Sequence, residues 1–120
     1  MTKIAIVEDN PDNLLLLQAI LGQDFELVTA ENGQEALASI PGSGVQLMLI
    51  DIALPGMDGV ELLGKLRLEA DLASIPAIAL TAHAMVGDKE KYIEIGFDDY
   101  YSKPILNFDE FKALIDSYLN

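Results

Sequence analysis

Short apolar blocks alternate along the chain with longer segments in which apolar residues recur at helical spacing. An uninterrupted run such as Ile4-Ala5-Ile6-Val7 is typical of a strand that is buried on both faces of a parallel sheet. The runs at residues 25–29 and 98–102 are more polar, as expected of the edge strands of a sheet. The pattern predicts strands at residues 3–7, 25–29, 45–51, 76–81 and 98–102.

Helix signals follow each of these strands. Asn10 is a good helix cap, and Pro11 suits the first turn of a helix that stops at Gly22. Asp58, three residues before Glu61, resembles a capping box. Further helices are expected at residues 34–40, after Asp58, at residues 88–95 closed by Gly96, and after a cap at Asn107. The residues of the last helix that are expected to face the core are Phe108, Phe111, Leu114, Ile115 and Tyr118.

Strand and helix signals alternate five times, without an internal repeat or a low-complexity tract. This order predicts an α/β fold in which five helices cover both faces of a five-stranded parallel sheet. Placing the two polar strands at the edges gives the strand order 2-1-3-4-5 of flavodoxin-like, doubly wound proteins. At 120 residues the chain fits a single domain, residues 1–120.

Acidic residues dominate the charge of the chain: 20 acidic and 7 basic residues give a net charge of −13. This charge opposes direct binding to nucleic acid and to anionic lipid. Cysteine is absent, which excludes disulfides and thiolate metal sites. The sequence begins without a charged leader and contains no apolar stretch long enough to cross a bilayer, so a cytoplasmic location is expected.

Polar residues follow four of the predicted strands: Glu8 and Asp9 the first, Asp51 the third, Thr81 the fourth and Lys103 the fifth. Because the carboxyl ends of parallel strands meet at one edge of a sheet, these side chains are expected to lie together. Three carboxylates about 4 Å apart repel one another by about 1 kcal/mol per pair even in water. A divalent cation would relieve this repulsion, and an all-oxygen ligand set favours Mg²⁺ over zinc or copper.

These residues have the chemistry that phosphoryl transfer requires. Asp51 can attack phosphorus as a carboxylate nucleophile and form an aspartyl phosphate. The Lys103 ammonium and Mg²⁺ can neutralise phosphoryl oxygens, and the Thr81 hydroxyl can donate a hydrogen bond to another. An isolated aspartate at a strand end is usually a solvated turn residue, so this prediction depends on the whole set of strand ends.

Over essentially its whole length the chain resembles the receiver domains of two-component response regulators. The resemblance implies that Asp51 accepts a phosphoryl group from the phosphohistidine of a histidine kinase or a histidine phosphotransfer protein. The motifs that carry it are Glu8-Asp9, Asp51, Thr81, Lys103-Pro104, Pro55-Gly56-Met57-Asp58-Gly59 and Gly96-Phe97-Asp98-Asp99-Tyr100.

The same resemblance implies a metal site and a switch. After phosphorylation Thr81 is expected to move toward the phosphate while Tyr100 turns inward. The face formed by the fourth helix, the fifth strand and the fifth helix then changes, and an unidentified downstream protein is expected to bind there. Such a domain assists its own phosphorylation and dephosphorylation and is not a turnover enzyme. The expected Mg²⁺ ligands are Glu8, Asp9, Asp51 and the backbone carbonyl of Ala53.

Four features depart from the commonest pattern of that family or vary within it. Glu8 replaces an aspartate, which keeps the charge and lengthens the reach to the metal. Ala53 offers no side chain to an attacking water, and His83 is expected either near that water or on the surface. No output domain follows the last predicted helix, so the chain is expected to be a receiver of the stand-alone type.

Three other functions are compatible with parts of this pattern. A Mg²⁺-dependent phosphohydrolase would need a general acid close after the nucleophile, and residue 53 is alanine. A degenerate receiver that acts as a phosphorylation-independent interaction module would lack an acid, the threonine or the lysine, and none is missing. A flavodoxin-type FMN carrier is disfavoured because the first loop, residues 8–13, is acidic and repels a phosphate that has no metal.

Overall fold

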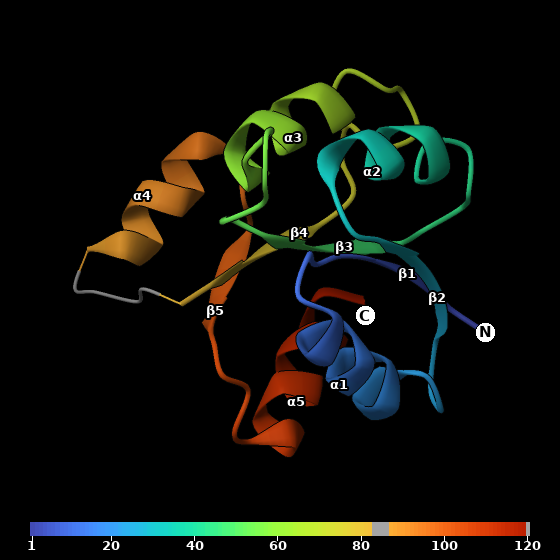
Figure 1. The fold of residues 1–120 in the computed structure, drawn as a ribbon, viewed down its shortest axis with the longest axis vertical. Coiled ribbons are helices and arrows are strands. Elements are labelled where there is room, and N and C mark those ends of the chain that lie inside the picture. The colour runs from blue at the N-terminus through green and yellow to red at the C-terminus, as the bar shows by residue number, and fades with distance from the viewer. Residues whose placement is uncertain (83–86, 120) are drawn as a thin grey trace.

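A computed structural model describes residues 1–82 and 87–119 of the chain. In this part of the chain, five strands form one parallel sheet in the order β2-β1-β3-β4-β5, as predicted (Figure 1). The more polar strands, β2 and β5, lie at its two edges. The strands are β1 Lys3–Val7, β2 Glu26–Ala30, β3 Leu47–Asp51, β4 Ala77–Thr81 and β5 Asp99–Ser102.

Helices cover both faces of this sheet. The helices α1 and α5 lie together on one face, whereas α2 and α3 lie on the other, with α4 beside the β5 edge (Figure 1). No helix in the described ranges has the length and apolar character that crossing a membrane would require. The helices are α1 Pro11–Leu21, α2 Gly33–Ser39, α3 Gly59–Leu66, α4 Asp88–Ile95 and α5 Phe108–Leu119.

The sheet separates two hydrophobic cores, because successive residues of a strand point to opposite faces. In β1, Ile4 and Ile6 face the layer of α1 and α5, whereas Ala5 and Val7 face the layer of α2 and α3. The central strands β3 and β4 are buried at every position. This double burial explains why their sequences are uninterrupted apolar runs.

Side-chain caps fix where four of the helices begin. The Asn10 side-chain oxygen accepts hydrogen bonds from the amides of Asp12 and Asn13, as a helix cap does. The predicted caps Asp58 and Asn107 likewise accept from the amide three residues ahead. Asn32 caps α2 in the same way, so this helix begins at Gly33, one residue earlier than predicted.

Other predictions also differ from the structure in detail, since β3, β4 and β5 begin one or two residues later than predicted. Phe25 precedes β2 because its amide donates to the Leu21 carbonyl and closes the turn after α1. Phe108 was expected to face the core but is 46% exposed, whereas Phe111 and Ile115 on the same stripe are fully buried. A helical side chain leans over the turn that precedes it, and the first residue of a helix has no such turn.

Candidate functional site

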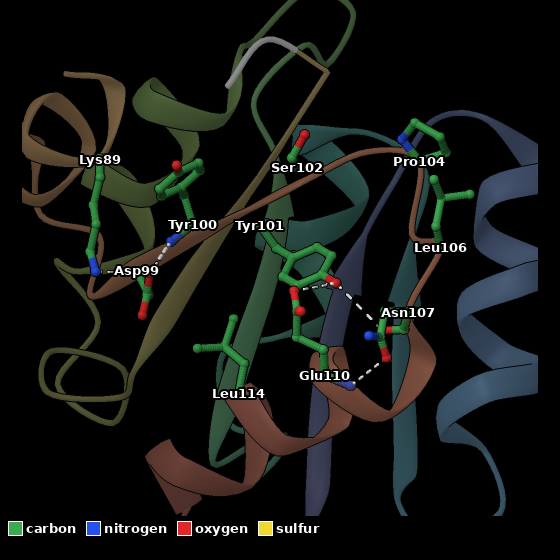
Figure 2. A pocket seen from close by; sticks show the side chains of 10 residues that line it. All are labelled: Lys89, Asp99, Tyr100, Tyr101, Ser102, Pro104, Leu106, Asn107, Glu110 and Leu114. Carbon is green, nitrogen blue, oxygen red and sulfur yellow. Dashed lines mark hydrogen bonds and ion pairs between the residues drawn. The ribbon is translucent and has the colours of Figure 1, made fainter. Parts of the chain in front are cut away.

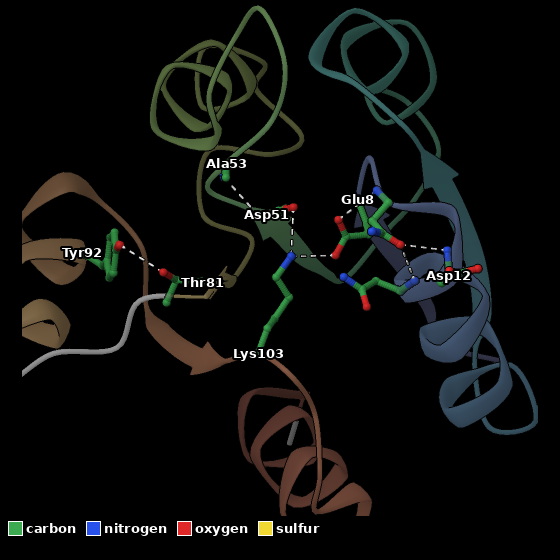
Figure 3. Close-up of polar contacts among 9 residues, drawn as sticks. Glu8, Asp12, Asp51, Ala53, Thr81, Tyr92 and Lys103 are labelled. Atoms are coloured by element: carbon green, nitrogen blue, oxygen red, sulfur yellow. Dashed lines mark hydrogen bonds and ion pairs between the residues drawn. The ribbon is translucent and has the colours of Figure 1, made fainter.

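The predicted strand-end residues lie together at the carboxyl edge of the sheet (Figure 3). The register pairs Val7 with Ile50 and Asp51 with Leu80, so that the strands end at nearly the same level. Glu8 follows β1 and Asp51 ends β3, and both side chains are almost completely buried. Parallel pairing therefore places carboxyl groups that are distant in sequence side by side.

Three acids form a cluster at this edge. Glu8, Asp9 and Asp51 each offer one carboxylate oxygen, and these oxygens all lie within 4.8 Å of one another. Ligands of a Mg²⁺ ion lie about 2.1 Å from the metal and therefore at most about 4.2 Å apart. Small side-chain shifts would bring the three oxygens to that spacing, so the donor set fits Mg²⁺.

Lys103 supplies a positive charge between two of these acids. Its Nζ atom lies 3.0 Å from Oε1 of Glu8 and 3.1 Å from Oδ2 of Asp51. The Lys103 amide also donates to the carbonyl of Thr81, which fixes the end of β5 beside β4. Because the Lys103 ammonium lies beside Glu8 and Asp51, part of the repulsion expected among the three carboxylates is offset within the protein itself. The Lys103-Pro104 peptide bond is cis.

The surroundings of Asp51 favour its ionised form. Its Oδ1 atom accepts a hydrogen bond of 3.0 Å from the amide of Ala53. Burial raises the pKa of Asp51, but hydrogen bonds from Glu8, the Ala53 amide and Lys103 outweigh burial and hold this pKa below its ordinary value. An ionised carboxylate keeps the lone pairs that a nucleophile needs.

Glu8 has the opposite electrostatic character. Burial and the neighbouring Asp51 raise the pKa of Glu8 to about 7, although Lys103 acts against this shift. The buried pair of acids therefore holds its negative charge mainly on Asp51. A cation that replaces the proton on Glu8 would restore the second charge.

A glycine allows the loop after Asp51 to pack closely. A β-carbon on Gly59, the first residue of α3, would lie 2.4 Å from the carbonyl oxygen of Asp51. The Gly59 amide donates to the Ile52 carbonyl at 3.0 Å. The start of α3 thus rests directly on the backbone that carries the acceptor candidate. Ala53, in the same loop, is exposed.

Thr81 ends β4 and has an aromatic neighbour that the sequence analysis did not single out. The hydroxyl of Tyr92, in α4, lies 3.5 Å from Oγ1 of Thr81, and both residues are buried. The ring of Tyr100 lies 6.3 Å from that of Tyr92. The sequence signal that could have identified Tyr92 is a single tyrosine in the middle of a mostly charged helix. His83 lies outside the described residues.

A separate cleft of about 570 Å³ runs beside β5 and the start of α5 (Figure 2). Its walls combine polar and apolar side chains, and the Tyr101 hydroxyl lies 3.1 Å from Oε1 of Glu110 within it. Its lining comes from α4, β5, α5 and the loop between β5 and α5, and includes Lys89, Tyr100, Leu106, Glu110 and Leu114.

Comparison with known proteins identifies the family. The response regulator receiver domain family matches residues 4–116. The polar-differentiation response regulator DivK of Brucella ovis is 39% identical over 121 residues, which cover 99% of this chain and 98% of DivK. The sensor protein GacS of Pseudomonas syringae pv. syringae is 39% identical over 107 residues, 86% of this chain, and the match spans 12% of the length of GacS.

A solved structure agrees with this relationship. The receiver domain of the sensor histidine kinase PA1611 of Pseudomonas aeruginosa PAO1 superposes with a TM-score of 0.88 at 29% identity, over 98% of this chain and 97% of that domain. That structure has a magnesium ion coordinated in its active site cleft. The chain therefore belongs to the response regulator receiver domain family of two-component signalling.

Proposed function

We propose that residues 1–120 form one receiver domain that accepts a phosphoryl group on Asp51. The donor is the phosphohistidine of a histidine kinase or of a histidine phosphotransfer protein, and the reaction takes place in the cytoplasm. The observation that carries this proposal is the setting of Asp51: it is buried at the end of β3, and the Lys103 ammonium lies 3.1 Å from its Oδ2 atom and helps to hold its pKa below the ordinary value.

The transfer is a substitution at phosphorus. One oxygen of Asp51 forms a bond to phosphorus while the bond between phosphorus and the donor's imidazole nitrogen breaks. The imidazole leaves with the electron pair of that bond and takes up a proton. Lys103 stabilises the charge that gathers on the phosphoryl oxygens, and the Thr81 hydroxyl can donate to one of them.

Mg²⁺ is the cofactor that fits the acidic cluster. The residues that would hold it are Glu8, Asp9 and Asp51, together with the backbone carbonyl of Ala53. When bound, Mg²⁺ supplies positive charge that neutralises phosphoryl oxygens. Because burial raises the pKa of Glu8 to about 7, a metal ion that binds Glu8 at neutral pH would compete with a proton.

The phosphorylated domain signals by binding another protein. In our proposal Thr81 and Tyr100 form the switch, and the partner binds the face formed by α4, β5 and α5, where the cleft beside β5 lies. Ala53 supplies no general acid for turnover, which supports a regulatory role rather than a phosphohydrolase. The acids, the threonine and the lysine are all present, which supports phosphate acceptance rather than a degenerate module.

Intact mass measurement tests this proposal directly. The chain is incubated with acetyl phosphate and Mg²⁺, and wild type is expected to gain the mass of one phosphoryl group. Asp51→Asn keeps the shape of the side chain and removes the nucleophile, so it should gain none. Asp58→Asn is the matched control, because the asparagine side chain can still accept a hydrogen bond from the Glu61 amide and cap α3.

The outcomes separate the assignments. If Asp51→Asn still gains one phosphoryl mass, Asp51 is not the acceptor. If wild type and Asp58→Asn gain none, the chain does not accept phosphate under conditions in which a receiver should.

A further inference from the structure

Helix α4 buries one side chain against the rest of the molecule. Within Asp88–Ile95, all of which the structure describes, Tyr92 is the buried residue, with 6% of its surface exposed. The cap residue is Gly87, which has a left-handed backbone (φ 94°) and no side chain that could cap the helix. A helix that buries little apolar surface is easily displaced. The contacts of Tyr92 therefore contribute much of what holds α4 in its position.

The Tyr92 ring connects α4 to β5 and to the strand-end site. It meets Phe97 edge to face, with ring centroids 6.2 Å apart, and it packs at 6.3 Å from Tyr100. Its hydroxyl lies 3.5 Å from Oγ1 of Thr81. The Tyr92 side chain thus contacts both Thr81, at the end of β4, and Tyr100, in β5.

The orientation of Thr81 is informative. Figure 3 shows its hydroxyl pointing toward Tyr92 and α4, and away from Asp51 and Lys103. Hydroxyl pairs usually lie about 2.7–2.8 Å apart, so a separation of 3.5 Å marks a weak bond. In this bond the Tyr92 hydroxyl donates and Thr81 accepts, so the bond favours one orientation of Thr81 but is too weak to keep it from turning to donate to a strong acceptor. A phosphoryl group on Asp51 would be such an acceptor.

We propose that Tyr92 is a positioning residue that holds the Thr81 hydroxyl on the α4 side of the site until Asp51 is phosphorylated. This inference rests on the proposed phosphoacceptor function. When Thr81 turns toward the phosphoryl group, the Tyr92 hydroxyl loses its contact with Thr81. A buried hydroxyl that loses its partner is costly, so Tyr92 and α4 move together to find another partner or water.

Two arrangements of the chain are coupled through this contact. A group that interacts in one arrangement and not in the other shifts their populations by its differential interaction energy. The Tyr92 hydroxyl favours the resting arrangement. Removing the hydroxyl while keeping the ring should therefore make the site easier to activate, by about two- to fivefold for one weak hydrogen bond.

The first test measures the contact itself, in protein without metal or phosphate. Tyr92→Phe keeps the ring that packs on Phe97 and Tyr100, and Thr81→Val keeps the shape of the side chain, so both variants should fold. In a double-mutant cycle from urea unfolding, the two changes should be non-additive by about two- to fivefold in the unfolding constant. The control cycle pairs Thr81→Val with Tyr118→Phe, whose hydroxyl contacts Asp98 and Asp99 instead, and should be additive. Additivity in both cycles would refute the proposal.

The second test measures the effect on the switch. Beryllofluoride, a phosphate mimic, is titrated with Mg²⁺ into each protein and its binding is followed by NMR. Tyr92→Phe should bind it about two- to fivefold more tightly than wild type, and Tyr118→Phe should match wild type. If wild type binds beryllofluoride and Tyr92→Phe binds it equally or more weakly, only the proposed role of Tyr92 is refuted, and the phosphoacceptor function stands. If wild type does not bind beryllofluoride, the acceptor site itself is refuted, and this proposal with it.

Discussion

Strand β3 and helix α4 are held in the molecule in opposite ways. All five residues of β3 are buried, and this strand pairs with β1 on one side and β4 on the other. In α4 one residue is buried, and most of the others are charged and face solvent. The first element carries Asp51, and the second lies beside the face that we propose to bind a partner.

In our proposal, this difference separates the site of phosphoryl transfer on β3 from the element that responds to it. A nucleophile must be held within a fraction of an ångström, which a strand buried on both faces provides. A switch needs an element whose two positions differ little in free energy, which a weakly packed helix provides. One fold can therefore hold β3 rigidly in its core and leave α4 loosely packed at its edge.

Truncating one apolar residue in each element should give the largest contrast. Leu49 is fully buried at the centre of β3, whereas Ile93 in α4 is 43% exposed. Leu49→Ala should lower the free energy of unfolding by about 2–5 kcal/mol, because it leaves a cavity in a packed core. Ile93→Ala should lower it by less than about 0.5 kcal/mol. Urea unfolding measures both, and equal losses would show that α4 is as firmly packed as β3.

The contrast between these elements also explains what the sequence could predict. Buried parallel strands are recognisable as apolar runs, so the sheet order and the meeting of Glu8, Asp51, Thr81 and Lys103 at one edge followed from pattern and topology alone. A helix over residues 88–95, mostly charged and closed by Gly96, was predicted, and the structure confirms it. The same pattern gave no reason to single out Tyr92.

Side-chain contacts inside the site depend on rotamers and could not be read from the sequence. The sequence analysis assigned Lys103 to the phosphate and expected a divalent cation to relieve the repulsion among the three carboxylates. The structure places its Nζ atom between Glu8 and Asp51, and this contact depends on how the lysine chain bends. The prediction that Phe108 faces the core was wrong for a related reason, because helical spacing does not show where the packed layer ends.

A pair of glycines in α3 tests how tightly the acceptor loop is packed. A β-carbon at Gly59 would meet the carbonyl oxygen of Asp51 at 2.4 Å, whereas one at Gly64 would have no neighbour within 4 Å. Gly59→Ala should cost about 1–3 kcal/mol and slow phosphoryl uptake, because the loop must shift. Gly64→Ala should stabilise the domain by about 0.5–1 kcal/mol, since alanine favours a helix.

Thermal unfolding and acetyl phosphate uptake measure both effects of the glycine variants. Loss of stability in Gly64→Ala as well would mean that α3, rather than the approach to Asp51, is sensitive to substitution. Normal uptake by a destabilised Gly59→Ala would mean that the loop moves without disturbing the acceptor.

Metal binding should stabilise the strand-end site by a smaller amount. At ten times its dissociation constant, Mg²⁺ bound to the folded chain contributes about 1.4 kcal/mol, which should raise the unfolding midpoint by roughly 3–7 °C. Asp9→Asn should lose most of this shift, because it removes one proposed ligand from an exposed position. Asp109→Asn, which removes the same charge from an exposed position of α5, should keep the shift.

The Mg²⁺ titrations are made at constant ionic strength, because salt also screens the net charge of −13. Equal shifts in wild type, Asp9→Asn and Asp109→Asn would mean that the acidic cluster does not form the ion's site.

The smallest effect concerns how α5 is fastened to β5, in contrast to α4. The Tyr118 hydroxyl lies 2.8 Å from Oδ2 of Asp99 and 3.0 Å from the carbonyl oxygen of Asp98. Burial and Asp99 raise the pKa of Tyr118 to about 12. Between pH 10 and pH 12 the unfolded chain therefore loses this proton while the folded chain keeps it, so this contribution to stability is complete below pH 10 and is lost as the pH approaches 12. Tyr118→Phe should cost about 1 kcal/mol at neutral pH and remove the last phase of the tyrosinate absorbance titration. Tyr101→Phe is the control, since the pKa of Tyr101 is also raised but its hydroxyl contacts Glu110 within the α5 side of the cleft. A late phase that persists in Tyr118→Phe and disappears in Tyr101→Phe would show that Tyr118 does not hold α5 against β5, and α5 would then be fastened by its apolar residues alone.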